Sequence, residues 1–244
     1  MFKHHVNRHQ ASTPPAVLHP LVAMQRIADY VGRHGYHWWI SGSAHEKKLP
    51  RLQAKFSTLY GIALHRNTRS RHKRSGKGAA VFLCYREPNS SPQCDVDVSC
   101  RWILLVAFGD HPAFAREALR DARTGQGRFH FGPYELVRAT RPGSANPAWC
   151  YRMSRAYSEA YRDRVIRCAR GDPSEPVDPV LRSLHTEPGW RPVRVEIGNL
   201  MALLRREWRR RRGHRAPLPT LTRLPYVQRL PNQMSYSRAA SRRS

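Results

Sequence analysis

Acidic residues are scarce in this chain of 244 residues. Asp and Glu together number 17, whereas Lys and Arg number 43, which gives a formal net charge of +26 at pH 7. Like charges at this density repel one another unless a polyanion screens them. Because most of the excess is arginine, whose planar guanidinium binds phosphate and stacks on bases, we expect the partner to be a nucleic acid, and RNA in particular.

Long apolar runs and closely spaced cysteines are also missing. The longest apolar stretch, Trp102 to Phe108, has the length of a strand and falls far short of the roughly 20 residues that span a bilayer. The basic N-terminal segment MFKHHVNRHQ is not followed by the hydrophobic core of a secretory signal. The five cysteines have no zinc-knuckle spacing and form no even set for disulfides. We therefore expect a cytoplasmic protein with reduced thiols, no membrane association, no metal site and no cofactor.

Hydrophobic periodicity predicts a mixed order of elements in the first 150 residues. A helix over 19–34 comes first, and a repeated pattern of strands and helices follows it. The repeated pattern consists of strand 36–40, helix 45–60 (starting late or kinked at Pro50), strand 79–86, strand 100–108, helix 112–124 and strand 134–140. This order is that of the split βαβ arrangement found in ferredoxin-like and RNA-recognition folds. The predicted fold class is α+β, with a ferredoxin-like core and a helical, Arg-rich C-terminal part.

The remaining chain is predicted to be mainly helical. A short strand over 148–153 leads into a helix over 154–169, and a long helix covers about 192–212. Between these helices, the Pro-rich piece GDPSEPVDP breaks the pattern. The predicted division is a flexible arm (1–18), a ferredoxin-like domain (19–153) with a basic insertion at 61–78, and a helical Arg-rich region with its tail (154–244).

The first of two basic clusters is HRNTRSRHKRSGKG, residues 65–78. It has almost no apolar side chain, so we expect that it does not pack and is either disordered or ordered by a phosphate backbone. Its candidate RNA-binding residues are Arg66, Arg69, Arg71, Lys73, Arg74 and Lys77.

The second basic cluster is RREWRRRRGHR, residues 205–215, which continues the last helix past its apolar stripe. A solvated helix face usually mixes charges of both signs, whereas here Glu207 is the only acid. We therefore expect this helix to bind duplex nucleic acid. The candidate residues are Arg205, Arg206, Arg209, Arg210, Arg212 and Arg215, together with Arg242 in the tail.

Aromatic residues lie on the predicted strands near these clusters. On an open sheet face they are able to stack on bases, as in RNA-recognition modules. We choose Trp38 as the candidate base-stacking residue and interpret Trp102 as a core residue. The others are Tyr36, Trp39 and Tyr85.

A candidate catalytic segment, SGSAHEKKLPRLQAK, follows the first predicted strand. Metal-free RNA cleavage needs a group that moves a proton and cations around the phosphate. We select His45, Lys48 and Arg51 as candidate catalytic residues, and Lys47 and Lys55 as further RNA-binding residues. A surface histidine without a catalytic role remains the alternative for His45.

These features together resemble the CRISPR-repeat RNA endonucleases, and most closely their arginine-rich type IV member. The resemblance covers residues 36–215 and rests on the ferredoxin-like front half, the basic insertion, the arginine-rich back half and the extreme basicity. It implies that the chain binds a repeat hairpin, cuts it by metal-independent attack of a 2′-hydroxyl, and keeps the crRNA inside an RNA-guided effector complex with other subunits. In this family, catalytic residues often follow the first strand, which matches the position of His45.

Two other functions fit part of the sequence. The family's glycine-rich loop near the C-terminus is missing from HRAPLPTLTRLPYVQRL. Its absence favours a non-catalytic nucleic-acid-binding protein of a plasmid or integrative element, with a role in replication or partition. A ribosome-assembly factor would explain the charge equally well, but not the tryptophans.

Overall fold

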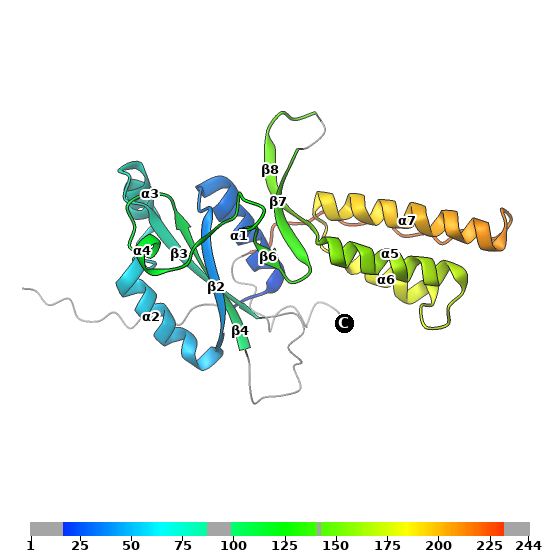
Figure 1. Cartoon of the computed structure of the whole chain (residues 1–244), viewed down its shortest axis with the longest axis horizontal. Coiled ribbons are helices and arrows are strands. Elements are labelled where there is room, and N and C mark those ends of the chain that lie inside the picture. The colour runs from blue at the N-terminus through cyan, green and yellow to red at the C-terminus, as the bar shows by residue number, and fades with distance from the viewer. Residues whose placement is uncertain (1–16, 87–98, 141–142, 232–244) are drawn as a thin grey trace, which may run out of the picture. The chain divides into compact units, whose positions relative to one another are not determined.

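The computed structural model describes residues 17–86, 99–140 and 143–231 (Figure 1). These residues form a mixed α+β structure with seven α-helices, a five-stranded mixed sheet and a separate three-stranded sheet. They divide into two compact units. The first comprises the described residues up to Asp121 together with Leu230 and Pro231, and the second is Ala122–Arg229. Each unit has a sheet and an apolar core of its own.

The five-stranded sheet belongs to the first unit and has the order β1-β3-β4-β2-β5. β1 pairs with β3 in parallel, and every other pair of neighbours is antiparallel. The strands are β1 Val17–Leu18, β2 Trp38–His45, β3 Ala79–Arg86, β4 Ser99–Ala107 and β5 Arg120–Asp121. The strands predicted at 79–86 and 100–108 are confirmed, and the strand predicted at 36–40 continues to His45.

Four helices accompany this sheet: α1 Pro20–His34, α2 Leu49–Tyr60, α3 Arg66–Arg74 and α4 Ala113–Arg116. The prediction of α1 is confirmed, and Gly35 ends this helix in the left-handed conformation, with φ 73°. α2 follows a short 3-10 helix, η1 Glu46–Lys48. Pro50 lies in the first turn of α2, where no N–H is needed, so the late start predicted for this helix is correct.

Trp102 lies on the sheet face that packs against α2. Its ring contacts Phe56 of α2 and Phe82 of β3, with centroid distances of 5.5 and 6.2 Å. The ring also covers Gly42 of β2, where an added Cβ would lie 2.6 Å from the indole. The interpretation of Trp102 as a core residue is therefore confirmed, and Gly42 is needed because the ring occupies the space of a side chain.

The helix predicted at 112–124 is wrong beyond its first turn. The backbone becomes extended at Glu117 (φ −126°, ψ 145°), and residues 120–121 pair with β2 as β5. The Tyr60 hydroxyl donates to the Glu117 carboxylate, and the Arg120 guanidinium lies 5.4 Å from the ring centre of Trp39. These tertiary contacts outweigh the helix propensity of the segment.

The strand predicted at Tyr134–Thr140 forms as β7, but not in the sheet where it was expected. It lies in the second unit, in an antiparallel sheet with the order β6-β7-β8, whose other strands are β6 His130–Phe131 and β8 Pro147–Met153. In the first sheet, β5 lies beside β2 as the edge strand.

The cluster at 65–78 is neither disordered nor without packing, which corrects the prediction. Residues 66–74 form α3, and the His65 Nδ1 atom accepts a hydrogen bond from the Asn67 N–H at 3.3 Å at its start. Near its end, Lys73 Nζ donates to the carbonyl of His34 at 2.7 Å and lies 4.8 Å from the ring centre of Tyr36. Arg and Lys favour helices, and cations in a last turn complement the helix dipole.

The second unit adds three helices: α5 Arg155–Arg170, α6 Val177–Thr186 and α7 Arg191–Arg212. The strand predicted at 148–153 and the helices predicted at 154–169 and 192–212 are confirmed to within two residues. The apolar stripe predicted for α7 is buried at Ile197, Leu200, Met201 and Leu204. It packs with α5 and α6 in one cluster.

The predicted division after residue 153 falls between β8 and α5, inside this second unit. The Pro-rich piece at 171–179 leads from α5 into α6, a helix that the sequence analysis did not predict. Of the predicted arm, residues 1–16 lie outside the described residues, and Val17 and Leu18 form β1.

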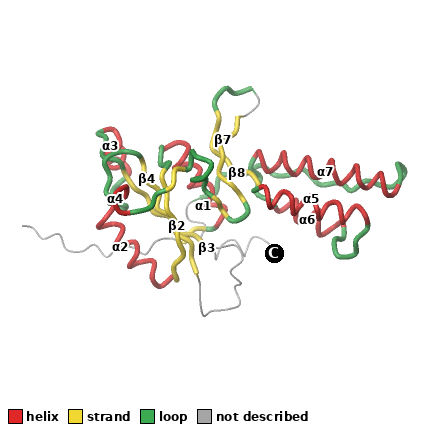
Figure 2. Tube along the Cα trace, in the orientation of Figure 1, coloured by secondary structure: helices red, strands yellow, loops and turns green. Residues whose placement is uncertain are grey.

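An extended segment, residues 213–231, follows α7 and runs back along this helix (Figure 2). Leu221 and Leu224 pack against the apolar cluster of the second unit. The Val227 N–H donates to the carbonyl of Gly189 at 3.1 Å, and an added Cβ at Gly189 would lie 2.3 Å from the Pro225 carbonyl oxygen. This close approach requires glycine at 189. Among the described helices, none combines the length and hydropathy needed to cross a membrane.

Candidate nucleic-acid interface

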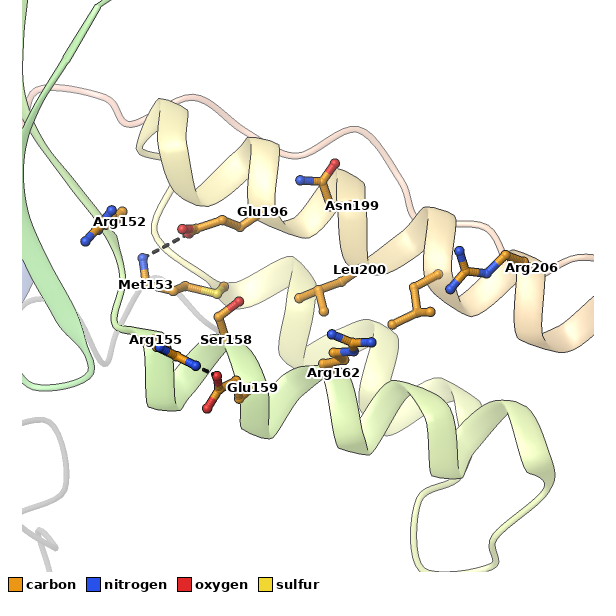
Figure 3. Close-up of a pocket in the computed structure, with 11 residues that line it drawn as sticks. Arg152, Met153, Arg155, Ser158, Glu159, Arg162, Glu196, Asn199, Leu200 and Arg206 are labelled. Atoms are coloured by element: carbon orange, nitrogen blue, oxygen red, sulfur yellow. Dashed lines mark hydrogen bonds and ion pairs between the residues drawn. The ribbon is translucent and has the colours of Figure 1, made fainter.

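A groove of ≈ 580 Å³ runs between α5 and α7 (Figure 3). The side chains that line it recur along each helix at spacings of three and four, so each helix presents one continuous row. On α5 the row is Arg155, Ser158, Glu159 and Arg162, and on α7 it is Glu196, Asn199, Leu200, Leu203 and Arg206. Arg152 and Met153 of β8 close one end.

The same two helix faces continue into a second hollow of ≈ 440 Å³. It is lined by Arg170 at the end of α5 and by Glu207, Arg210 and Arg211 on α7. Together the two hollows form what we call the arginine groove. Its arginines are Arg152, Arg155, Arg162, Arg170, Arg206, Arg210 and Arg211.

Positive charge increases along the arginine groove, away from β8. At the β8 end, Arg152 pairs with Glu135 at 2.9 Å and Arg155 pairs with Glu159 at 2.8 Å. At the other end, Glu207 is shared between Arg206 and Arg210, at 3.7 and 3.0 Å. Within the described part of the chain, Arg162, Arg170 and Arg211 make no ion pair.

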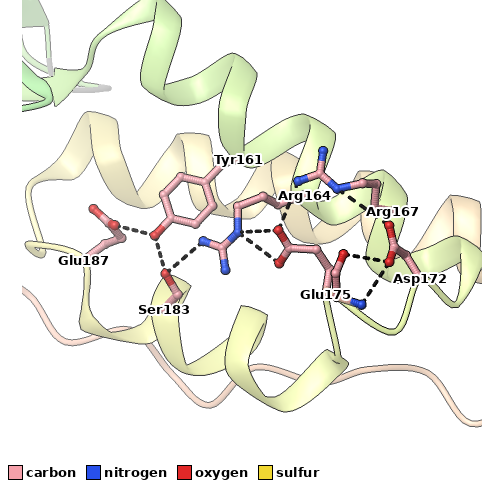
Figure 4. Close-up of polar contacts among 8 residues, drawn as sticks. Tyr161, Arg164, Arg167, Asp172, Glu175, Ser183 and Glu187 are labelled. Carbon is pink, nitrogen blue, oxygen red and sulfur yellow. Dashed lines mark hydrogen bonds and ion pairs between the residues drawn. The ribbon is translucent and has the colours of Figure 1, made fainter.

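The opposite side of α5 uses its arginines to hold the unit together (Figure 4). Arg164 and Arg167 both pair with Glu175, at 3.1 and 3.0 Å, and so fasten the turn before α6. Beside them, the Tyr161 hydroxyl donates to Glu187 at 2.6 Å. The arginines of α5 that remain for a ligand are therefore those of the arginine groove.

The six arginines predicted on the last helix and just beyond it have different surroundings. Arg206 and Arg210 line the groove, and Arg209 and Arg215 are exposed. Arg205 donates to the carbonyl of Pro219 at 3.4 Å. The Arg212 guanidinium stacks 3.6 Å from the ring centre of Trp208 and donates to the carbonyl of Ala169. It therefore ties the end of α7 to the end of α5. Arg242 lies outside the described residues.

The basic residues predicted at 65–78 form a second surface, on α3. Arg66, Arg71, Arg74 and Lys77 are exposed, and Arg69 is half-buried. Lys73 is the tether to α1, and burial, followed by the charge of Arg69, lowers its pKa. Burial and the charge of Lys73 also lower the pKa of His34.

The aromatic residues proposed to stack on bases are mostly covered. Trp38 lies among apolar side chains, edge to face with Phe114 at 5.5 Å. Tyr36, Trp39 and Tyr85 are all buried. These strands belong to the core, so packing inside the protein explains the aromatic residues in their sequence.

Phe108 is an exposed aromatic residue that the sequence analysis did not single out, with 77% of its surface accessible. It follows the last residue of β4. Its neighbour Gly109 packs against the backbone of Gly78, and a Cβ added to Gly109 would lie 2.3 Å from the Gly78 nitrogen. The Asp110 N–H donates to the Gly76 carbonyl at 2.7 Å. Phe108 is therefore held beside the loop that leaves α3. The turn sequence GDHP directly after Phe108 is the sequence feature that could have indicated its exposure.

We define the α3 surface as Arg66, Arg71, Arg74, Lys77 and Phe108. It combines exposed cations with an exposed ring, which are the two groups that bind phosphates and unpaired bases.

The candidate catalytic residues lie at the end of β2. His45 Nδ1 accepts a hydrogen bond from the Lys47 N–H at 3.1 Å. When Nδ1 accepts, the proton of the neutral ring is on Nε2. Strand alternation places His45 on the face opposite α2, whereas Lys48 and Arg51 are exposed at the start of α2, and Lys47 and Lys55 are exposed as well.

Strand pairing brings a further cation to the His45 face. Arg101 of β4 is exposed and directly opposite Ser43, and Ser99 is opposite His45. Arg101 is thus the diagonal neighbour of His45. Arg101 could not be identified from the sequence, because cross-strand register is not visible along one strand.

The described residues thus define an α+β protein with two arginine-rich surfaces, one on each compact unit. Comparison of the chain with protein-family models, with curated proteins and with solved structures found no match. Among the described side chains, no group of three or more His, Cys, Asp or Glu is placed to hold a metal ion.

Proposed function

We propose that this protein binds structured RNA in the arginine groove and is a metal-independent endoribonuclease that processes CRISPR-repeat hairpins into crRNA. The observation that carries the proposal is the row of arginines along the facing sides of α5 and α7. In this proposal the protein acts in the cytoplasm, keeps the crRNA, and joins other subunits in an RNA-guided effector complex.

The arginine groove suits a duplex better than a flexible strand. α5 has 16 residues, so at 1.5 Å per residue it is about 24 Å long. At the rise of about 3.4 Å per nucleotide of a B-DNA strand, this length corresponds to roughly seven phosphates, and the smaller rise of an A-form RNA duplex brings slightly more of them alongside. Rigid helices match the fixed phosphate spacing of a duplex at several points at once.

We further propose that the sheet of the first unit is a ferredoxin-like, RNA-recognition-type core. The strands β2, β4 and β3 are neighbours in that order, and β5 takes the place on the other side of β2. The three pairings among these four strands are all antiparallel, and this is the strand order that a split βαβ arrangement requires.

For cleavage, we propose that a 2′-hydroxyl of the RNA attacks the adjacent phosphorus while its proton passes to solvent. The bond to the 5′-oxygen breaks, that oxygen takes up a proton from solvent, and a 2′,3′-cyclic phosphate remains upstream. The His45 Nε2–H donates a hydrogen bond to a phosphate oxygen and so stabilises the charge that develops there. Lys48, Arg51 and Arg101 stabilise the charge on the phosphate. The support is the Nδ1 bond, which leaves the proton on Nε2, and the position of Arg101 as the cross-strand diagonal neighbour of His45.

RNA binding is tested with a matched pair of double variants. Arg206→Ala with Arg210→Ala removes two charges from the groove, whereas Arg182→Ala with Arg223→Ala removes two exposed charges outside it. We expect the first variant to bind a repeat hairpin at least tenfold more weakly, an unstructured RNA of equal length to lose less, and the second variant to stay within twofold. Equal losses in both variants would contradict a dedicated groove.

Cleavage is tested in EDTA with a repeat hairpin. We expect cutting with a 5′-hydroxyl on the downstream product, no cutting when the attacking nucleotide is 2′-deoxy, and slower cutting but unchanged binding for His45→Ala. If the protein binds hairpins tightly and never cuts a repeat, with or without metal, the non-catalytic plasmid or integrative-element binder replaces the enzyme.

A further inference from the structure

Glu196 is an acid in a groove that otherwise suits phosphate. It lines the groove from α7, and one of its carboxylate oxygens, Oε2, accepts a hydrogen bond from the Met153 N–H at 2.9 Å (Figure 3). This bond fixes the carboxylate at the end of β8. A carboxylate has acceptor capacity beyond one hydrogen bond, so the group is able to accept from a ligand as well.

The β8 end of the groove is unsuited to phosphate. Glu135, Glu159 and Glu196 lie on or beside it, and the first two already pair with Arg152 and Arg155. The two arginines at this end are therefore already neutralised, while Arg162 further along makes no ion pair among the described residues. Phosphate is repelled by a carboxylate, so the ligand group at this end must bring hydrogen-bond donors.

The surroundings of Glu196 suit a flat ring. Leu203, which is half-buried, lines the same hollow beside the nearly covered side chains of Met153 and Leu200 and offers an apolar surface. Asn199 is three residues from Glu196 on α7 and so lies on the same helix face, with an amide that both donates and accepts. Burial raises the pKa of the Glu196 carboxyl, so its ionised form gains from a donor that a ligand supplies.

We propose that the β8 end of the arginine groove binds one unpaired cytosine of the RNA, with Glu196 accepting from its N4 amino group and Asn199 hydrogen-bonding to its adjacent edge. A carboxylate is the acceptor that matches the cytosine amino group, whereas uracil presents an acceptor at that position. Arg162 and Arg206 then hold the phosphates that flank the base. The inference rests on the RNA binding proposed above, and it adds a sequence preference to it.

The preference is measured with hairpins that carry unpaired nucleotides beside the stem, each changed in turn from C to U. A good base contact discriminates by about 1–3 kcal/mol, which is about 5- to 150-fold in affinity. We expect one position at which the wild-type protein binds the C form at least fivefold more tightly than the U form.

Glu196→Gln gives the sharpest test. Its amide oxygen keeps the bond to the Met153 N–H, and its NH₂ group replaces the acceptor that faces the base. We expect the preference for C to disappear or to change to U, whose O4 accepts. Asp163→Asn is the matched control, because it makes the same kind of change on an exposed carboxylate of α5 that does not line the groove, and it should keep the preference for C.

Asn199 is exposed, so Asn199→Ala tests the same site without touching the core. This variant should reduce the ratio of the affinities for the C and U forms of the hairpin, even if Glu196→Gln fails to fold. Equal binding of C and U forms by the wild type, or an unchanged preference in both Glu196→Gln and Asn199→Ala, overturns the base site. If the Arg206 and Arg210 variant still loses affinity in that case, the proposed function stands. Absence of RNA binding by the wild type overturns the proposed function itself.

Discussion

Phe108 shows that exposure can carry more functional information than residue type. Single exposed apolar side chains are common on proteins, but this ring is fixed by the backbone contacts of Gly109 and Asp110 beside the basic loop that leaves α3. A base that stacks on it would keep its phosphates near cations such as Lys77. Trp38, which the sequence favours for this role, is packed among its neighbours.

We expect Phe108→Ala to weaken the binding of RNA with unpaired nucleotides about 5- to 150-fold, because one stacked base contributes about 1–3 kcal/mol. Thermal stability should change little, since the ring is 77% exposed. Fluorescence anisotropy with single-stranded and fully paired RNA measures the effect. Phe108→Trp should retain affinity, and an equal loss for fully paired RNA would speak against stacking.

In the second unit, the buried carboxylate of Glu187 accepts hydrogen bonds from three tyrosine hydroxyls. Tyr157 and Tyr161 donate to its carboxylate at 2.8 and 2.6 Å, and Tyr134 donates to it as well. Burial, reinforced by Glu187, raises the pKa of all three tyrosines. Their hydroxyls therefore stay protonated in the folded protein at a pH where unfolded tyrosines, with a pKa of about 10, already ionise.

The sign of the pH effect follows from this difference. The contribution to stability is complete below about pH 10 and is lost as the pH rises towards the higher pKa values of the folded state. We expect the free energy of unfolding to fall above about pH 10, as measured by denaturant titration at pH 8 and pH 11. Tyr157→Phe should cost about 1–3 kcal/mol at pH 8 through the lost bond to Glu187, yet make the fall shallower. A fall as steep as that of the wild type would contradict the assignment.

At the scale of elements, local pattern predicted those parts whose packing follows their own periodicity. The stripe from Ile197 to Leu204 in α7 is an example, and α1 and β3 are others. The pattern failed where distant residues decide the structure. Glu117 leaves the helix because Tyr60 and the edge of β2 offer partners, and neither is visible within residues 112–124.

The candidate site was predictable only in part, for the same reason. The arginines of α7 stand out by charge, but those of α5 are spread through its sequence, and only the packing of the two helices lines up Arg162 with Arg206. It is also not visible in the sequence that the Arg212 guanidinium stacks on Trp208 and donates to the carbonyl of Ala169. Charge alone does not distinguish an arginine that contacts the rest of the protein from one that is available to a ligand.

α3 is joined to α1 by a side chain near its end. It has no buried residue, so Lys73, which binds the His34 carbonyl at 2.7 Å and covers Tyr36, fixes it to α1. We expect Lys73→Ala to raise the rate of trypsin cleavage within residues 66–74 severalfold, whereas Arg74→Ala, which is exposed, should not. Cleavage sites mapped by mass spectrometry measure this. Equal protection in the wild type and Lys73→Ala would show that other contacts hold the helix.

For the whole molecule, the net charge of +26 predicts how binding depends on salt. Each phosphate that a cation neutralises releases condensed counterions, and the slope of log affinity against log salt changes by about −0.7 to −0.9 per phosphate. Apart from Arg152 and Arg155, which pair with Glu135 and Glu159, the two surfaces offer nine cations: Arg66, Arg71, Arg74, Lys77, Arg162, Arg170, Arg206, Arg210 and Arg211. If each contacts one phosphate, the slope is about −6 to −8.

The same measurement separates specific contacts from diffuse attraction. Replacing Arg206 and Arg210 by Ala removes two phosphate contacts, so we expect the slope to become less steep by about 1.4 to 1.8. Replacing Arg182 and Arg223 removes the same charge from outside the groove and should leave the slope unchanged. Affinities between 50 and 300 mM salt, measured with one hairpin, give all three slopes. A slope near zero for the wild type would refute the electrostatic basis of binding, and equal changes in the two variants would mean that RNA responds to the total charge and not to the groove.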